Sequence, residues 1–271
     1  MNSKQNLLDI QKIKEDNRCQ WMAGEIVYLE ETGSTNIEAT RLASEGLGHG
    51  TLVLTDSQIG GRGRRGRSWH TPKGTSIAMS MIMKPQMEAE YASMLTLVQA
   101  MAVAKAMEEV SGLQAQIKWP NDILVHEKKV CGILTEMNLD GSKIASIIIG
   151  TGINVNQEEF PEEIADIATS LKKEMGSFVS REELIGQICY YFEKYYEAFM
   201  QTKDLSDIME EYNERLISRG RSVRVLEPKG EFAAEALGIN PKGELLVKKE
   251  DGQMENIYAG EVSVRGIYGY V

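Results

Sequence analysis

The spacing of apolar and turn-forming residues changes at Arg219-Gly220, and this change divides the sequence into two parts that must fold differently. Before it, long segments mix helical spacing with strand-like alternation of apolar residues. After it, short alternating segments near 222–226, 231–237, 244–249 and 257–265 are separated by turns rich in proline and glycine. Closely spaced strands with such turns predict a small β-barrel. We therefore expect an arm over 1–23, a large domain over 24–218 and a small β domain over 219–271.

The first part contains both strand and helix patterns. Strands are expected near residues 25–29, 51–55, 75–83, 116–118, 123–126, 130–138 and 144–149. Helices are expected after residue 36 and over about 90–110, 180–199 and 205–217. Ser34, Thr35 or Asn36 is suited to cap the first helix, and Ser180-x-x-Glu183 forms a capping box before the third.

Overall charge and cysteine usage exclude several classes of protein. The 271 residues carry a formal net charge of −10, and an acidic chain binds nucleic acid poorly unless positive charge is concentrated locally. No apolar run approaches the roughly 20 residues that span a bilayer, and the N-terminus lacks the apolar core of a secretory signal. Three distant cysteines and three histidines form neither a disulfide framework nor a metal-binding spacing. We expect a cytoplasmic protein without membrane contact.

One stretch does concentrate positive charge. Residues 60–69 read GGRGRRGRSW, so four arginines alternate with glycines between two expected strands. Glycines let the backbone bend and present N–H groups, and arginines match phosphate and carboxylate oxygens. Three interpretations are open: a nucleic-acid segment, a solvated basic loop, or a lid that is mobile when empty and orders over a nucleotide or acyl phosphate. The loop is neither a Walker loop nor a Rossmann fingerprint, so phosphate chemistry needs another scaffold.

Two further motifs have an ordinary and a functional interpretation. KWPND at 118–122 is followed by Lys128-Lys129 and Gly132, and asparagine and aspartate at such a turn usually cap the backbone. GTGINV at 150–155 ends a very apolar strand, where glycines permit close approach of a ligand or an ordinary bend. Neither motif decides the function by itself.

In this order and spacing, the motifs closely resemble those of the biotin–protein ligase family. The resemblance rests on GRGRRGRSW at 61–69, KWPND at 118–122, Lys129 with Gly132, and GTGIN at 150–154, and it is strong over about 25–160. Gly33-Ser34-Thr35-Asn36 and Gln58 stand where the family has early biotin contacts, and Gly260-Glu261 and Arg265 fit its C-terminal part. The resemblance implies an α+β fold, in which a class II aminoacyl-tRNA synthetase-like domain with a mixed sheet and flanking helices precedes an SH3-like β-barrel.

The resemblance also implies a reaction and residue roles. Biotin's carboxylate attacks the α-phosphate of MgATP, giving biotinyl-5′-AMP and pyrophosphate, and a lysine of a biotin carboxyl carrier domain then takes the biotin and releases AMP. The implied catalytic residues are Arg64 and Lys129. The implied biotin contacts are Ser34, Thr35, Gln58, Gly61, Arg62, Arg64, Lys129, Gly132, Gly150 and Ile153. The implied ATP contacts are Arg67, Trp69, Lys118, Asn121, Asp122, Asn154 and Arg265, with Asp122 near Mg²⁺.

Partners and alternatives follow from the same resemblance. The expected partner is the biotin carboxyl carrier domain of a biotin-dependent carboxylase, and a homodimer is compatible with a family that often pairs through a sheet edge. The arm over 1–23 is too short for the DNA-binding domain of some members, so no specific DNA binding is expected. Two alternatives stay open: a lipoate–protein ligase, which shares the fold and the acyl-adenylate chemistry, and a binding module, either a degenerate ligase or an RNA binder.

Overall fold

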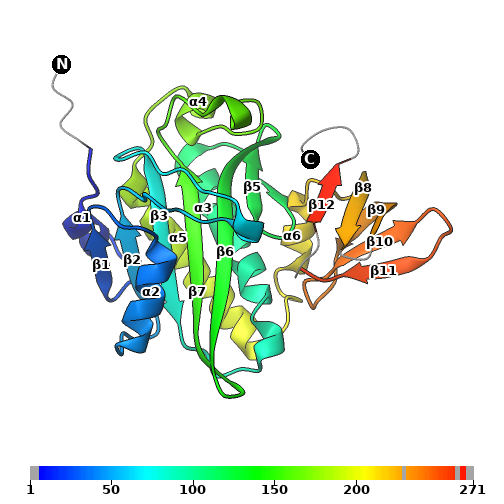
Figure 1. Cartoon of the computed structure of the whole chain (residues 1–271), viewed down its shortest axis with the longest axis horizontal. Coiled ribbons are helices and arrows are strands. Elements are labelled where there is room, and N and C mark those ends of the chain that lie inside the picture. The colour runs from blue at the N-terminus through cyan, green and yellow to red at the C-terminus, as the bar shows by residue number, and fades with distance from the viewer. Residues whose placement is uncertain (1–5, 228–229, 260–262, 267–271) are drawn as a thin grey trace.

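The computed structural model describes residues 6–227, 230–259 and 263–266. They form a seven-stranded sheet in the N-terminal part and a five-stranded sheet at the C-terminal end (Figure 1). Strands β1 to β7 precede residue 155 and β8 to β12 follow residue 221, so the two sheets are consecutive in the sequence.

The large sheet is mixed. Its strands are β1 (Ile26–Leu29), β2 (Thr51–Thr55), β3 (Ser76–Met83), β4 (Gln116–Lys118), β5 (Asp122–Val125), β6 (Lys128–Asp140) and β7 (Lys143–Asn154), in the spatial order β1-β2-β3-β7-β6-β5-β4. β1 and β2 run parallel, and every other neighbouring pair is antiparallel. The long neighbours β6 and β7 therefore lie near the centre, where they offer the most surface to the layers on either side.

Helices cover the two faces of this sheet unequally (Figure 1). α3 (Met94–Ser111) and α5 (Arg181–Thr202) pack together on one face, where the odd-numbered isoleucines of β7 join the main core. α2 (Thr35–Ser44) lies on the other face, where Ile148 and Ala39 belong to a much smaller cluster. Because side chains alternate along a strand, one face holds most of the core and the other is available for a site.

Shorter elements complete the chain. They are α1 (Ile10–Glu15), α4 (Leu171–Met175), α6 (Met209–Arg215) and the 3-10 turns η1 (Arg64–Gly66), η2 (Ala89–Tyr91) and η3 (Glu162–Ile164). The small sheet contains β8 (Ser222–Glu227), β9 (Gly230–Ile239), β10 (Leu245–Lys249), β11 (Met254–Ile257) and β12 (Ser263–Gly266), antiparallel in the order β11-β10-β9-β8-β12. Trp119 Nε1 donates to the carbonyl of Gly243 over 3.0 Å, which ties the small sheet to the turn between β4 and β5.

The N-terminal arm is packed into the large domain. Leu8, Ile13 and Met22 are buried in the main core. Glu193 of α5 accepts hydrogen bonds from the backbone N–H groups of residues 20, 21 and 22. Hydrogen bonds to a charged acceptor are stronger than neutral ones, so these three fix the path of the arm along α5.

A buried ion pair joins the arm, the sheet and α5. Arg181 Nη1 donates to Asp56 Oδ1 over 2.6 Å and to the carbonyl of Ser76 over 3.0 Å, and both charged side chains are fully buried. Asp56 also accepts from the Tyr28 hydroxyl at 2.7 Å, and Arg181 also donates to the carbonyl of Asn6. Buried charges are tolerated when they are paired and hydrogen-bonded, and each member of this pair has several partners.

The predicted helix caps have mixed outcomes. Ser180 caps α5 as expected, because its side chain accepts from the N–H of Glu183. The expected side-chain cap of α2 is wrong: Ser34 makes no side-chain cap hydrogen bond. Gln58 Oε1 instead accepts from the N–H of Thr35 over 2.8 Å. A distant side chain therefore satisfies this helix end.

Several predicted boundaries also differ. The helix expected over 205–217 is shorter, because the N–H of Leu205 donates to the carbonyl of Pro241 and that of Ile217 to the carbonyl of Ile117. α3 begins at Met94 rather than at 90. Lys128-Lys129, expected between two strands, begins β6, because a two-residue turn joins it to β5. The strand expected over 257–265 is two strands, β11 and β12, and Gly260-Glu261 lies outside the described residues.

The described residues contain no helix that is long and apolar enough to cross a membrane. All three cysteines are free, with Cys131 and Cys189 buried and Cys19 partly buried. This agrees with the expectation that no disulfide framework holds the fold.

Replacing Arg181 by methionine should destabilise the protein strongly, because Asp56 would stay buried without its cation. We expect the free energy of unfolding to fall by about 3–5 kcal/mol, the usual loss when one partner of a buried pair is removed. Urea unfolding followed by circular dichroism measures this. The control is Arg41→Met, whose ion pairs with Glu38 and Glu45 are on the surface, and which should stay close to wild type. Equal losses in the two variants would contradict the role given to the buried pair.

Candidate active site

A pocket of about 510 Å³ opens on the face of the large sheet that carries α2. Its floor contains Gly132 of β6 and Gly150 and Gly152 of β7, and Gly132 and Gly152 are direct partners across the two strands. Ile148 fills the same face two residues before Gly150. Because the three glycines have no side chain, the surface of the sheet is hollow here and a ligand can approach the backbone.

The wall beside α2 is a network of neutral polar side chains. Gln58 Oε1 accepts from the N–H of Thr35 over 2.8 Å and from its hydroxyl over 3.2 Å. Ser80 Oγ lies 2.8 Å from Thr35 Oγ1 and 2.6 Å from Asn36 Oδ1. A Cβ on Gly150 would overlap the Asn36 amide, so the wall packs directly onto the floor. This side of the pocket offers fixed donors and acceptors without net charge.

The arginine–glycine loop closes the pocket from above. Its ends are joined by an isolated bridge between Gln58 and Thr71, and the N–H of Trp69 donates to the carbonyl of Gly61 over 2.9 Å. The loop contains the short turn η1 and no strand. The cationic side chains therefore lie on a narrow loop whose two ends are hydrogen-bonded to each other.

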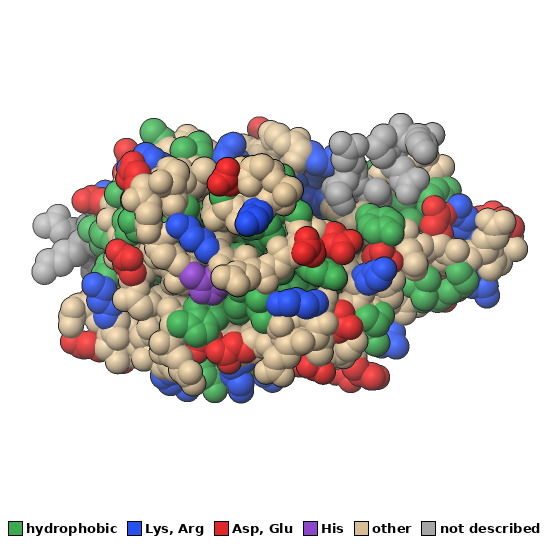
Figure 2. All heavy atoms as spheres, turned by 90° about the horizontal axis from the view of Figure 1, so that it is seen from below, with side chains coloured by type: hydrophobic (Ala, Val, Ile, Leu, Met, Phe, Trp, Pro, Cys, Tyr) green, Lys and Arg blue, Asp and Glu red, His purple; other side chains and the backbone are tan. Residues whose placement is uncertain are grey.

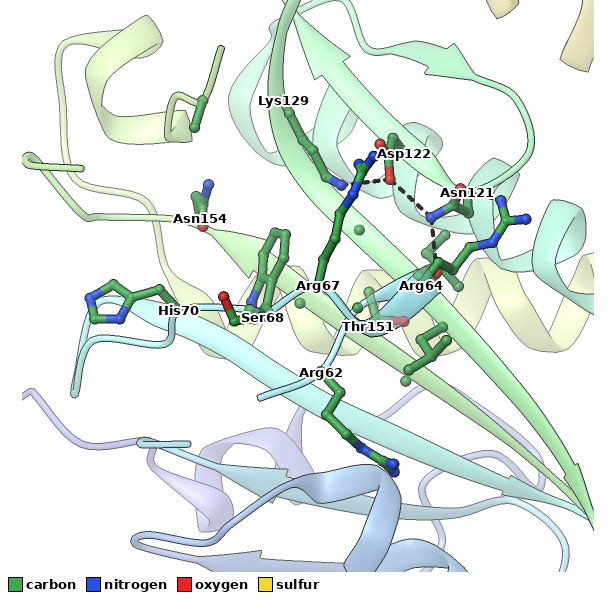
Figure 3. A pocket seen from close by; sticks show the side chains of 18 of the residues that line it. Arg62, Arg64, Arg67, Ser68, His70, Asn121, Asp122, Lys129, Thr151 and Asn154 are labelled. Carbon is green, nitrogen blue, oxygen red and sulfur yellow. Dashed lines mark hydrogen bonds and ion pairs between the residues drawn. The ribbon is translucent and has the colours of Figure 1, made fainter. Parts of the chain in front are cut away.

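The arginines of the loop point in different directions (Figure 3). Arg62 points away from the pocket centre, and its guanidinium lies 3.4 Å from Glu136. Arg64 donates to Asn121 Oδ1 over 2.9 Å and to the carbonyl of Ala259 over 2.7 Å, so it links the loop to the small domain. Burial lowers the pKa of the Arg64 guanidinium. Protein contacts have therefore replaced part of its hydration.

Lys129 and Asp122 form an ion pair inside the pocket. Lys129 Nζ lies 2.7 Å from Asp122 Oδ1, and Asn121 Nδ2 donates to the same oxygen over 3.0 Å. Arg67 points toward this pair in Figure 3. The Lys129 side chain is 21% exposed, whereas Lys128 is exposed and does not line the pocket. The structure thus distinguishes Lys129, which lines the pocket, from its sequence neighbour Lys128, which does not.

Trp69 lies over the glycine floor. A Cβ on Gly132 would lie 3.1 Å from its ring, and a Cβ on Gly152 would overlap it. Lys129 Nζ is 5.6 Å from the ring centroid. The indole Nε1 is buried and has no hydrogen-bond partner among the described residues. This N–H is directed at the floor, because a Cβ on Gly152 would lie 2.3 Å from it.

The remaining wall comes from a segment that no sequence motif marks. Its lining residues are Phe160, Ile164, Ile167 and Ala168. The segment is paired with β6, because the N–H of Lys129 donates to the carbonyl of Ile167 over 2.8 Å and the N–H of Thr169 to the carbonyl of Lys129 over 2.9 Å. Asn154 Nδ2 donates to the carbonyl of Thr169 over 3.0 Å. This stretch has neither a helical nor a strand period, so only its place after GTGINV pointed to it.

The pocket brings together most residues that the sequence singled out. Those that line it are Ser34, Thr35, Gln58, Arg62, Arg64, Arg67, Trp69, Lys118, Asn121, Asp122, Lys129, Gly132, Gly150 and Asn154. Gly61 is buried against the backbone of Trp69 and does not line it. Ile153 is fully buried in the main core on the opposite face of β7. Arg265 lies in β12 opposite Arg224, and its side chain is outside what the structure describes.

The lining is strongly positive, although the whole chain has a net charge of −10. Among the described residues that line the pocket, six are arginine or lysine and one, Asp122, carries a carboxylate, although Arg62 points away and pairs with Glu136. The cations are Arg62, Arg64, Arg65, Arg67, Lys118 and Lys129. By contrast, acidic and basic side chains are intermixed on the face shown in Figure 2. Concentrated positive charge in a concave site attracts anionic ligands.

Comparison with known proteins identifies the family. Residues 28–154 match the model of the biotin/lipoate A/B protein ligase family, and residues 219–265 match the biotin protein ligase C terminal domain. The bifunctional ligase/repressor BirA of Bacillus subtilis is 37% identical over 263 residues, which cover 96% of this chain and 80% of that protein. The chain belongs to the biotin protein ligase family.

Further relatives agree with this membership. A biotin–[acetyl-CoA-carboxylase] ligase of Paracoccus denitrificans is 32% identical over 243 residues, covering 88% of this chain and 100% of that protein. The structure of the Aquifex aeolicus biotin protein ligase in complex with biotin and ATP superimposes with a TM-score of 0.79 and 32% identity, covering 90% of this chain and 99% of that one. The expected α+β fold, with a mixed sheet, flanking helices and a C-terminal β domain, is confirmed.

Proposed function

We infer that this biotin protein ligase activates biotin with ATP to biotinyl-5′-AMP and then transfers the biotin to a lysine of a carboxylase carrier domain. The observation that carries the proposal is the pocket in which Arg64, Arg67, Lys118 and Lys129 lie around a floor of three glycines. The comparisons support it, since a relative is named a biotin–[acetyl-CoA-carboxylase] ligase and a related structure holds biotin and ATP.

Adenylation must bring together two anions, the carboxylate of biotin and the triphosphate of ATP. Their repulsion has to be offset by cations that are already in place, because fixed charges need no reorganisation during the reaction. Lys129 and Arg67 lie on the same side of the pocket (Figure 3). Asp122 now neutralises Lys129 from 2.7 Å, and an entering carboxylate or α-phosphate can take over that contact. We assign Lys129 as the residue that holds both reacting groups.

We assign the biotin ring to the neutral wall beside α2. Gln58, Thr35 and Ser34 can exchange hydrogen bonds with the ureido group, which carries one carbonyl and two N–H groups. Gly132 and Gly150 add no side chain of their own to the floor, and we assign the apolar part of biotin to the space beside them, next to Trp69 and Asn36. The biotin contacts proposed for Arg62, Gly61 and Ile153 stay predictions. Since Ile153 is buried on the other face of β7, it can contribute only through its backbone.

ATP is assigned to the side between the loop and the segment at 160–168. Trp69 offers a ring face to adenine, and the Asn154 amide is already oriented by the carbonyl of Thr169. Phe160 and Ile164 add apolar surface to the same side. Lys118, Asn121 and Arg67 are assigned to the phosphates, and the phosphate contact of Arg265 stays a prediction.

Mg²⁺ is assigned to Asp122 together with ATP. No cluster of three histidine, cysteine, aspartate or glutamate side chains is arranged to hold a metal in the described part of the chain. Asp122 alone fits, because Mg²⁺ in nucleotide sites is usually bound by one or two carboxylates, the phosphates and water. The ion would neutralise phosphate charge. Magnesium titration of the exchange reaction below tests this assignment, and exchange that needs no divalent ion would contradict it.

We propose the carrier domain as acceptor and a homodimer as the assembly. The pairing of β5 with β6 ends at Gly132. Beyond it, β6 has only β7 as a neighbouring strand in the part that the structure describes. Met137 and Leu139 on this edge are 39% and 52% exposed, and free edges with apolar side chains tend to pair with other chains. A monomer in light scattering, with and without biotin and ATP, would contradict the dimer.

We also propose that the chain acts in the cytoplasm and does not bind specific DNA. Its free cysteines suit a reducing compartment. The described part of the arm, residues 6–23, is packed against α5, and the net charge is −10. Retardation of an operator fragment at physiological salt would contradict the second proposal.

Biotin-dependent exchange of pyrophosphate into ATP tests the function directly. Purified protein with Mg²⁺ should catalyse exchange with biotin and not with lipoate, because the polar wall matches a ureido ring. Exchange with lipoate alone would keep the family and change the substrate. No exchange with either acid would favour a binding module, and strongly salt-dependent RNA binding would then favour an RNA partner.

Lys129→Ala should lose adenylation far more than Lys128→Ala. We expect exchange to fall by about 100-fold or more, the usual loss when a fixed donor to developing charge is removed. The Lys128 variant is the matched control, since it removes the same charge one residue away, and it should stay close to wild type. Initial exchange rates at saturating biotin and ATP measure both. Equal losses would mean that the wrong lysine was assigned.

Arg64→Gly should form biotinyl-5′-AMP but release it, because a loop that excludes water also retains the intermediate. The measurement is the ratio of free to enzyme-bound intermediate after rapid filtration. Arg65→Gly is the control: it removes one charge from the same loop at a position with φ 58°, which glycine adopts easily. Retention of the intermediate as in wild type would contradict the role of Arg64 in the lid.

A further inference from the structure

The turn that precedes Lys129 is held in an unfavourable conformation. β5 and β6 are joined by His126 and Glu127, whose φ angles are 48° and 63°. Two-residue hairpin turns of this kind require positive φ at both positions, and asparagine and glycine usually supply it. Neither residue here is of that kind. Strain of this sort persists only where the surroundings hold it, so the contacts of the two side chains are informative.

Both side chains of the turn make polar contacts with other segments. Glu127 is 3.1 Å from Arg221, but both side chains are more than half exposed, so this pair contributes little. His126 Nδ1 is 2.6 Å from Glu174 Oε2, and the Glu174 side chain is only 19% exposed. Burial alone would raise the pKa of Glu174, but hydrogen bonds from His126 and Thr169 lower it on balance. The carboxylate is therefore charged where it holds the turn.

The second oxygen of Glu174 reaches the active site through Thr169. Thr169 Oγ1 donates to Glu174 Oε1 over 2.5 Å, and Thr169 is almost completely buried. The carbonyl of Thr169 accepts from Asn154 Nδ2, and its N–H donates to the carbonyl of Lys129. The Glu174 carboxylate thus connects His126, in the turn before Lys129, with Thr169, whose carbonyl orients Asn154. His126, Glu174, Thr169 and Lys129 form a closed ring of contacts behind the pocket wall.

We propose that Glu174 is a positioning residue for the nucleotide side of the site. It does not line the pocket. It fixes Thr169, and the carbonyl of Thr169 orients the Asn154 amide, whereas the Lys129 side chain is held separately by Asp122. The inference rests on the proposed function, because the orientation of Asn154 matters in this way only if ATP binds beside it. The biotin wall is built on Gln58, Thr35 and Ser80, whose side-chain hydrogen bonds in the described part of the chain run to one another, to Asn36 and to Thr71.

The test compares Michaelis constants for ATP and biotin in the exchange reaction. Glu174→Ala should raise KM for ATP by about tenfold or more, the factor expected for one lost charge-assisted hydrogen bond, and leave KM for biotin within about twofold. Thr169→Val, which removes only the hydroxyl, should show the same split. Glu174→Gln keeps an oxygen that accepts from Thr169 and should restore most of the affinity for ATP.

Glu158→Ala is the matched control, because it breaks an exposed ion pair with Lys172 on the same segment and does not touch Thr169. It should behave as wild type. A parallel rise of both Michaelis constants with a lower melting temperature, or a Glu174→Ala enzyme indistinguishable from Glu158→Ala, would overturn the proposal. Failure of the proposed function is distinguishable, since the unmodified protein itself would then show no biotin-dependent exchange.

Discussion

The buried pair between Arg181 and Asp56 is the contact on which the catalytic face depends. Asp56 follows β2 and Ser76 begins β3, so Arg181 holds the start and the end of the segment that contains the arginine loop. The loop repels itself and contains no strand. Its path is therefore set at its base, by a charge from α5 on the opposite side of the sheet. The same pair also fixes the N-terminal arm, which explains why that arm belongs to the fold.

The site is built by removing side chains from a face that is otherwise packed. Ile148 contributes to the small cluster beneath α2, whereas Gly150, Gly152 and Gly132 on the same face let Asn36 and Trp69 pack against the backbone. Neutral hydrogen-bonding groups lie on one side of this floor and cations on the other. This division matches a substrate with a polar ring at one end and an anion at the other. The net charge of −10 does not reveal this arrangement, because Asp122 is the one acidic side chain among the described residues that line the pocket.

Much of the fold could be predicted because the signals were local. The strands at 51–55 and 116–118 and the capping box at Ser180 depend on neighbouring residues, whereas the site residues around Lys129 were implied by the resemblance to the family. The predictions that were wrong concerned features that depend on tertiary contacts. Gln58 caps α2 across 23 positions, and the backbone of Leu205 turns to Pro241 instead of continuing a helix. The wall at 160–168 has no periodicity and becomes a wall only by pairing with β6.

The three glycines of the pocket floor lower the stability of the sheet that contains them. Glycine inside a strand weakens a sheet, because it loses more backbone entropy on folding and packs nothing against its neighbours. Here three glycines occupy the two longest strands, side by side at the centre of the sheet. Selection for a more stable sheet alone would replace them, and any replacement would add a Cβ toward Trp69 or Asn36. The residues that weaken the sheet and the residues that form the floor of the pocket are therefore the same.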